Sequence, residues 1–460
     1  MLDAPQNAAA QYSGSTEIPI ARIFGVSILV CLLLCVALLS LFGVSLVPLF
    51  LAGGAATLVW LAFRYPITGL GGFLAFMPIY TLAFLLTKFF GPPYVALLEG
   101  CDRVVLLLFT YILWRRNGVK FTVPDWLLLI CFGLAVARLF FSGTLLGLLT
   151  DFNFVIAYAA GRVTALTTEQ EKLWAKRAVW IVAVLSVLGM TEIFLIGEGP
   201  RTVLYLSVAN GGTAGQSLDA AFHADQYLGL RESATMFGPL QFAPLCMAAL
   251  ILWWVYFRNP IPGAMIAAGL VCSVTRSAWV GTAVAISVLA MLMGQQKRLL
   301  RYGILAVALF AAAIPVLGLS DYLLSTKSGQ DPSRLSHQES IFGGFAYALN
   351  HPLGTGPGNL GKWAAKEDRN AVGIEDSYLT IAAEYGIPSV LCFLGFLVLA
   401  LRALWREHTR AAYVAIGVLA GFGVVMMFAA LHDVFPLACW IWFPVGLAMR
   451  SSAVRSPDCL

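Results

Sequence analysis

The sequence predicts an all-α polytopic membrane protein with about 12 to 14 transmembrane helices and a long external loop that carries short surface helices. Of the 460 residues, 60% are hydrophobic and only 12% are charged, and the mean hydropathy is +0.83. Soluble domains are about half apolar and about a quarter charged, so this composition excludes both a soluble globule and a disordered chain. The net charge of +5 therefore relates to membrane orientation and gives no indication of nucleic-acid binding.

Apolar runs between charged breaks predict the individual spans. They lie at 23–42, 44–63, 67–87, 94–114, 124–141, 143–161, 178–196, 234–257, 261–275, 277–294, 302–319, 378–401, 411–430 and 433–449. This pattern divides the chain into a cytoplasmic tail (1–22), N-terminal spans (23–196), an external loop (197–233), central spans (234–319), a large external loop (320–377), C-terminal spans (378–449) and a second cytoplasmic tail (450–460).

The basic residues predict the orientation of these spans. With the N-terminus inside, most of the 29 Lys and Arg residues fall in loops on the inner side, as the positive-inside rule requires. Both termini are then cytoplasmic, and the two long loops are external. Long loops in a compact protein are usually functional, so we expect the active surface outside.

Cysteine usage argues against a disulfide framework or a metal centre. The nine cysteines lie mostly in apolar runs, and the sequence contains neither a CxxC pair nor a His/Cys cluster with metal-ligand spacing. We predict no metal site and no cofactor.

The large external loop contains a predicted helix. Asp331-Pro332 is a typical helix start, with an acidic cap and proline at the first helical position. Apolar residues and His337 then recur every four residues until His351-Pro352 ends the pattern. We expect this helix to lie along the membrane surface with Arg334 and His337 on neighbouring positions.

Charged residues at membrane depth need partners or a function. For Arg138 and Asp151, structural pairing is the favoured interpretation, and Glu192 belongs to the same class. Arg276 interrupts two apolar runs near the outer face. It is either a loop arginine that reaches the lipid headgroups or a functional cation.

Two short motifs lie near the last spans. Gly356, Gly358 and Gly361 formally match GxGxxG, but no strand precedes them, so we interpret them as an irregular turn rather than a nucleotide loop. Glu375-Asp376 precede Ser377-Tyr378-Leu379, and an acidic pair at a helix start is either a cap or a functional pair.

The order of elements over residues 231–449 resembles the superfamily of O-antigen ligases and Wzy-type polysaccharide polymerases. The motifs that carry the resemblance are Arg231 with Phe237-Gly238-Pro239, Thr275-Arg276-Ser277, the Arg334 helix followed by the 351–356 turn, and Glu375-Asp376-Ser377-Tyr378-Leu379 with Glu384-Tyr385-Gly386. The last motif is similar to the family's His-Asn-x-x-Leu with a downstream Glu-x-Gly. The chain departs from the family at Glu375, where the ligases carry a histidine implicated in transfer.

The resemblance implies a multi-pass enzyme of the bacterial inner membrane with its active site facing the periplasm. It implies that a sugar hydroxyl attacks the anomeric carbon of a glycan attached to undecaprenyl diphosphate, and the diphosphate leaves. Arg231, Arg276, Arg334 and His337 are the candidates for diphosphate binding, and Arg276, Arg334, Glu375 and Asp376 are the candidate catalytic residues, with either acid as the base. The expected partners are the lipid-linked oligosaccharide, membrane lipids and a chain-length regulator.

The departure at Glu375 favours a polymerase of exopolysaccharide or O-antigen over a ligase. The sequence of the external loops contains no DxD or other clustered acid pair with a supporting ligand set, so we expect the transfer to be independent of metal ions. Transfer of finished glycan to lipid A core or protein stays open as an alternative. A polysaccharide or solute transporter is a second alternative, because Arg138, Asp151 and Glu192 would line a solute path in such a protein. A non-enzymatic scaffold is a third.

Overall fold

In the computed structural model, the described residues are helical or irregular, and none of them is in a strand. The structure describes residues 47–90, 95–196, 234–236, 238–316, 332–360, 374–432 and 434–455. The all-helical class predicted from composition is confirmed. The predicted span 23–42, the loop 197–233 and Arg231 lie outside the described residues.

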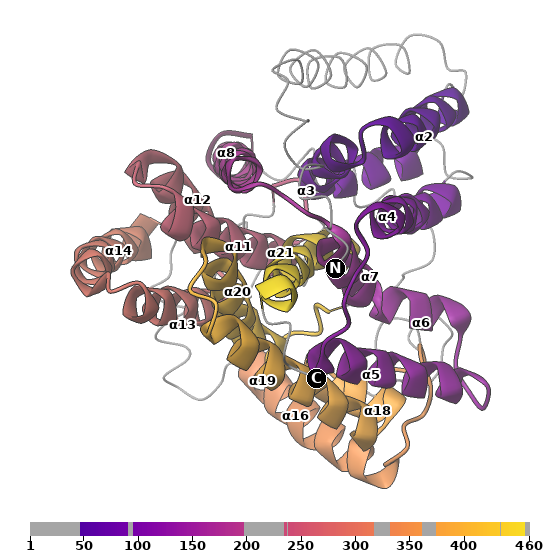
Figure 1. Cartoon of the computed structure of the whole chain (residues 1–460). Helices are drawn as coiled ribbons and strands as arrows, with labels where there is room; N and C mark the ends of the chain where they lie inside the picture. The colour runs from indigo at the N-terminus through magenta and orange to yellow at the C-terminus, as the bar shows by residue number, and fades with distance from the viewer. Residues whose placement is uncertain are drawn as a thin grey trace.

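Figure 1 shows the described helices in chain order, from α2 to α21. The N-terminal group comprises α2 (Val47–Arg64), α3 (Pro66–Phe90), α4 (Val95–Asn117), α5 (Val123–Leu139), α6 (Leu145–Asp151), α7 (Asn153–Val163) and α8 (Thr168–Thr191), with a π-helical turn at Glu192–Ile196. The central group comprises α11 (Pro239–Tyr256), α12 (Pro260–Cys272), α13 (Arg276–Leu292) and α14 (Gln296–Val316). The C-terminal group comprises α16 (Pro332–Asn350), α18 (Ser377–Tyr385), α19 (Ile387–Trp405), α20 (Arg410–Met426) and α21 (Phe435–Arg455).

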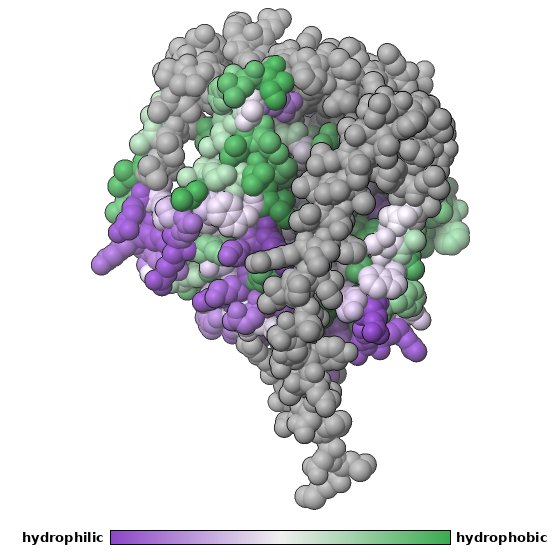
Figure 2. Space-filling view, turned by 90° about the horizontal axis from the view of Figure 1, so that it is seen from above, coloured by the Kyte–Doolittle hydropathy of each residue, from purple (hydrophilic) through white to green (hydrophobic). Residues whose placement is uncertain are grey.

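Four helical segments are long and apolar enough to cross a membrane: Pro66–Phe84, Thr168–Ile196, Pro239–Tyr256 and Ile387–Trp405. Shorter apolar helices accompany them at Pro260–Cys272, Arg276–Leu292, Arg410–Met426 and Phe435–Arg450. On the face in Figure 2, hydrophobic residues gather on one part and hydrophilic residues gather on another. The chain is a multi-pass membrane protein.

Arginines identify one end of the helix bundle, which we call the basic end. Arg116 donates to Phe63 O at 2.7 Å, and Arg298 donates to Trp254 O at 2.9 Å. At the end of α21, Arg450 donates to Gly118 O and Arg162 O at 3.0 and 3.1 Å. Cations at helix C-termini satisfy the last carbonyl groups and interact favourably with the helix dipole. These contacts bring together several of the loops that the sequence assigns to the cytoplasm.

A buried ion pair fixes the basic end. The guanidinium of Arg162 binds both carboxylate oxygens of Asp125, at 2.9 and 2.7 Å, and Tyr158 donates to the same carboxylate at 2.7 Å. Arg162 and Asp125 are both buried. The bidentate geometry joins the start of α5 to the end of α7.

Close helix contacts at glycine hold the centre of the bundle together. A Cβ at Gly446 of α21 would lie 2.1 Å from Tyr158 O of α7, and one at Gly281 of α13 would lie 2.6 Å from Gly421 O of α20. Small residues let the helix backbones approach each other, as they do in membrane helix packing. Phe154, Phe393 and Trp442 fill the space beside these contacts with rings 5.3–6.0 Å apart.

Two predicted spans contain a break. The segment predicted at 143–161 is divided at Phe152 into α6 and α7, and the segment predicted at 378–401 is divided at Gly386 into α18 and α19. Gly386 has φ +93°, which favours glycine, and Pro388 follows in the first turn of α19. Both breaks lie within longer apolar runs, and the few polar residues at each break did not reveal them.

The helix predicted from Pro332 is confirmed. It is α16, which begins at Pro332 and ends at Asn350, immediately before His351-Pro352. It packs against α18, and Figure 1 shows it beside α18 and α19.

Candidate active site

The candidate site begins at the N-terminus of α18. Asp376 is the cap residue, and its Oδ1 accepts a hydrogen bond from Leu379 N at 2.8 Å. The capping interpretation of the acidic pair is thus confirmed for Asp376. Burial raises the pKa of this half-buried carboxyl, while the backbone N–H groups of Leu379 and Tyr378 and the nearby His432 act in the opposite direction.

The next two residues join α18 to the end of α20. Ser377 is fully buried, and its hydroxyl donates to Ala429 O at 2.8 Å and accepts from Leu431 N at 3.3 Å. Tyr378 donates to Gly423 O at 3.1 Å. Within the Glu-Asp-Ser-Tyr-Leu motif, Ser377 and Tyr378 therefore position the helix start.

Glu375 lies between α18 and α16. Its side chain is exposed, and its backbone N–H donates to Ser340 Oγ at 2.8 Å. Arg334 and His337 precede Ser340 on α16, six and three residues earlier, which corresponds to about 9 and about 4.5 Å along the helix axis. Of these two residues, the structure describes the backbone alone.

Arg276 is the first residue of α13. The preceding loop is tight and buried: Val274 has φ +48°, Ser273 Oγ donates to Leu270 O at 2.6 Å, and Thr275 Oγ1 donates to Pro239 O at 3.4 Å. The last contact holds the start of α13 against the start of α11. Arg276 itself is half-buried.

Arg276 and Asp376 lie on the same end of the bundle. Gly281 of α13 contacts Gly421 of α20, and Arg276 lies five residues, or about 7.5 Å, before Gly281. From Gly421, α20 continues five residues to its end at Met426, on the same side as Arg276. The residues after Met426 that contact Ser377 therefore lie near the level of Arg276 along the bundle. We call this end, opposite the basic end, the Arg276 end.

The segment 354–360 is an irregular turn, as the sequence analysis predicted. Gly354, Gly356 and Gly358 all have positive φ, at +80°, +98° and +73°. A Cβ at Gly356 would lie 2.3 Å from Ser142 O, and one at Gly354 would lie 2.4 Å from Glu384 O. Gly361 lies outside the described residues.

This turn is bonded to the break between α18 and α19. Thr355 N donates to Ala383 O at 2.9 Å, Gly356 N donates to Glu384 O at 2.8 Å, and Ile387 N donates to Pro352 O at 2.9 Å. The carboxylate of Glu384, which is 2% exposed, accepts from Leu360 N at 3.0 Å. The turn thus provides donors and acceptors where the helix ladder is interrupted.

Two charged residues of the N-terminal half, the half-buried Arg138 and the buried Asp151, contact the same region. Arg138 donates through Nη2 to Gly354 O, and Asp151 accepts from the hydroxyl of Tyr385. Ser142 donates to Thr355 O at 2.6 Å. The structural interpretation of Arg138 and Asp151 agrees with these bonds, although both residues contact the C-terminal half of the chain.

The sequence analysis missed a histidine at the Arg276 end. His432 follows Leu431 in the connection between α20 and α21, and it is 2% exposed. Its ring lies edge-on to Phe154, with centroids 6.4 Å apart. Neither ring nitrogen has a hydrogen-bond partner within the described part of the chain. The available signal was a polar Leu-His-Asp turn between two apolar runs, at the end remote from the basic loops.

One comparison with known proteins finds a match within this region. Residues 261–394 match the family model Wzy_C, described as O-antigen ligase. We refer to this matched segment as the Wzy_C domain. The comparison with curated proteins gives no match. This match supports an enzyme of the membrane that transfers glycan, of the O-antigen ligase or polymerase type. The resemblance stated above is confirmed over residues 261–394.

The Wzy_C domain contains most of the residues discussed. It extends from α12 into α19, and so includes Arg276, Arg334, Glu375, Asp376 and Glu384. Arg231 and His432 lie outside its limits. Among the described residues, no three or more His, Cys, Asp or Glu side chains are grouped as a metal site would require.

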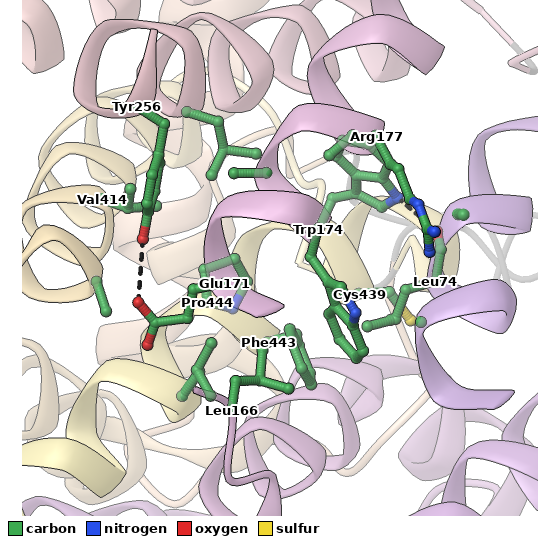
Figure 3. Close-up of a pocket in the computed structure, with 18 residues that line it drawn as sticks. Leu74, Leu166, Glu171, Trp174, Arg177, Tyr256, Val414, Cys439, Phe443 and Pro444 are labelled. Carbon is green, nitrogen blue, oxygen red and sulfur yellow. Dashed lines mark hydrogen bonds between the residues drawn. The ribbon is translucent and has the colours of Figure 1, made fainter. Parts of the chain in front are cut away.

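Figure 3 shows a cavity between α3, α8, α11, α20 and α21. It is lined mainly by apolar side chains such as Trp174 and Phe443, and Glu171 accepts a hydrogen bond from Tyr256 at its edge. Tyr256 is the last residue of α11, and Ala411 in the lining is near the start of α20. The cavity is therefore at the basic end, and we do not assign the transfer chemistry to it.

Proposed function

We propose that the protein is a polysaccharide polymerase that transfers an undecaprenyl-diphosphate-linked glycan repeat unit to a sugar hydroxyl at the outer face of the bacterial inner membrane. The observation that carries the proposal is that Arg276 and Asp376, both inside the Wzy_C domain, lie at the same end of the bundle, opposite the basic end.

In this proposal, arginines bind the leaving group. The bond between the anomeric carbon and the diphosphate oxygen breaks, its electron pair stays on that oxygen, and the acceptor oxygen forms the new bond to the same carbon. Negative charge grows on the diphosphate, and a guanidinium can hold phosphate oxygens in a bidentate manner without losing its proton. Arg276 is the candidate for this binding whose side chain the structure describes. Arg334, Arg231 and His337 are further candidates.

Asp376 is the favoured proton acceptor for the hydroxyl. It is half-buried, and its raised pKa makes its carboxylate a stronger base than an exposed one. Glu375, its exposed neighbour, is the alternative base.

The matched domain is described as an O-antigen ligase, so ligation is the second candidate. In that case the acceptor is lipid A core or protein rather than the growing glycan. The presence of Glu375 where the ligases have histidine favours polymerisation. Polymer length and acceptor modification, measured in a deletion strain and its complement, distinguish the two reactions.

A transporter is less well supported. Its proposed solute path depended on Arg138, Asp151 and Glu192. Arg138 and Asp151 are bonded to Gly354 and Tyr385 and so contribute to packing between the two halves of the chain.

The variant Arg276→Ala tests whether Arg276 binds the diphosphate leaving group. We expect polymer to fall by about 10²-fold or more, the usual effect of removing one donor to a developing anion. Arg276→Lys should recover only part of the activity, because a lysine cannot bind in a bidentate manner. Polymer is measured by gel electrophoresis, and protein abundance is measured in the membrane fraction.

The matched control for this test is Arg402→Ala, which removes an exposed arginine from the last turn of α19 at the basic end. It should leave polymer unchanged. A wild-type amount of polymer in Arg276→Ala would contradict the proposed binding of the diphosphate by Arg276.

We further propose that transfer is independent of metal ions, because arginines supply the charge that a divalent ion would otherwise provide. Transfer in membrane vesicles should therefore persist in excess EDTA. Loss of transfer in EDTA with recovery on addition of magnesium would refute this part of the proposal.

A further inference from the structure

His432 carries an inference that goes beyond the assignment of Arg276 and Asp376. Its imidazole is 2% exposed, and both ring nitrogens lack partners within the described part of the chain. Buried polar atoms are nearly always hydrogen-bonded, so an exception of this kind requires an explanation. Packing alone does not provide one, because a phenylalanine would fill similar space beside Phe154 without an unsatisfied nitrogen.

The position of His432 suggests the explanation. Leu431, the preceding residue, donates to Ser377 Oγ at 3.3 Å, and Ser377 donates to Ala429 O at 2.8 Å. These two bonds hold the turn of His432 against the start of α18, where Asp376 is the cap. Ser377 is directly adjacent to Asp376 in the chain. The turn that carries the imidazole therefore lies near the carboxyl proposed as base, and His432 lowers the pKa of that carboxyl, against the larger effect of burial.

The elements that surround His432 offer few other ionisable groups. On the α18 side there are Asp376 and Tyr378. On the α4 side, Asp102 and Arg103 pair with each other at 3.3 Å, and Arg103 also donates to Asn153. Arg103 lies over the ring of Phe435, three residues after His432. Because Asp102 already has a cationic partner and His432 acts on the pKa of Asp376, Asp376 is the acid that we assign to His432.

We propose that His432 acts through Asp376: it receives, from the Asp376 carboxyl, the proton that the acceptor hydroxyl has given up. The acceptor hydroxyl gives its proton to the Asp376 carboxylate as its oxygen bonds to the anomeric carbon and the diphosphate leaves with the electron pair. The proton then moves from Asp376 to a ring nitrogen of His432, which restores the carboxylate. This inference rests on the proposed transfer reaction, and it assigns the imidazole to an element outside the Wzy_C domain.

The test compares stability with turnover. In His432→Phe the ring is retained and both unsatisfied nitrogens are removed, so the variant should unfold at the same temperature as the wild type or a higher one. Its rate of polymer formation should nevertheless fall by about tenfold or more, because proton-transfer groups contribute large rate factors. The rate is measured in membrane vesicles that carry the cell's own lipid-linked repeat unit.

A second variant separates proton transfer from packing. His432→Ala opens space at the ring position, and added imidazole should restore part of its rate, whereas imidazole should not restore His432→Phe, in which the space is filled. A wild-type rate in His432→Phe, or no response of His432→Ala to imidazole, would overturn the proposal.

Failure of this inference is distinguishable from failure of the proposed function. If Asp376→Asn and Arg276→Ala abolish polymer while His432→Phe is fully active, only the role of His432 is wrong. If all three variants make normal polymer, the transfer site itself is misassigned, and the role of His432 is overturned with it.

Discussion

At the scale of single residues, the Wzy_C domain contains two kinds of polar side chain. Ser377, Tyr378 and Glu384 accept or donate to the backbone of other segments and are buried or half-buried. Arg276 and Asp376 are half-buried at one end of the bundle. The first group determines where the second group lies.

The Glu384 carboxylate gives a prediction about stability. Glu384→Ala removes the acceptor for Leu360 N in a buried position, and an unsatisfied buried N–H costs about 1–3 kcal/mol. Glu384→Gln retains an oxygen that can accept this bond. We therefore expect the alanine variant to unfold in detergent at a lower temperature than the glutamine variant. Equal unfolding temperatures for the two variants would show that the bond to Leu360 contributes nothing.

Sequence reasoning found some of these residues and missed others for a physical reason. Arg276 was identified because charge beside an apolar run is costly and therefore conspicuous. Asp376 was identified as one of an acidic pair at a predicted helix start, within a motif similar to the family's. His432 was not identified, because its environment is made by Phe154 and Ser377, which are far from it in sequence. Glu384 was recognised only as part of a motif, and its partner Leu360 is visible in the fold alone.

At the scale of elements, the main feature is the half-helix α18 followed by a break and a bonded turn. Gly386 ends α18, and the segment 352–356 provides backbone groups to the residues around the break. Non-helical backbone at membrane depth is tolerated only where protein or a water-filled cavity surrounds it. The turn therefore permits α18 to end inside the protein and to present Asp376 at its start.

Gly356 tests the importance of this turn. Gly356→Ala adds a Cβ 2.3 Å from Ser142 O at a residue with φ +98°, so the turn must move away from α5 and α6. We expect a lower unfolding temperature and reduced polymer. Gly133→Ala is the matched control: Gly133 lies within α5, nothing is within 4 Å of its added Cβ, and alanine is the better helix former by about 1 kcal/mol. If both variants behave alike, the close approach at Gly356 is unimportant.

The elements were predicted unequally well. α16 was predicted from its start at Pro332 to its end before His351, because its cap, its periodicity and its terminating proline are all local signals. The break at Gly386 was not predicted, because a single glycine within an apolar run does not distinguish an interrupted helix from a continuous one. The turn that stabilises the break comes from a segment some thirty residues earlier.

At the scale of the whole molecule, the two ends of the bundle differ chemically. The basic end contains Arg116, Arg162, Arg298 and Arg450, bonded to carbonyl groups of other segments or to Asp125. The opposite end contains Arg276, Asp376 and His432. Because basic loops favour the cytoplasm, we predict that the basic end is cytoplasmic and the Arg276 end is periplasmic.

Two cysteine reporters test this orientation in cells with a permeabilised outer membrane. Glu375→Cys is at the exposed start of α18, and His408→Cys is at the exposed turn before α20, at the basic end. A membrane-impermeant maleimide should label Glu375→Cys while the inner membrane is intact and should label His408→Cys only after lysis. The wild-type chain, whose described cysteines are buried or partly buried, provides the background. Labelling in the reverse order would put Arg276 and Asp376 on the cytoplasmic side, where a periplasmic polymerase cannot act.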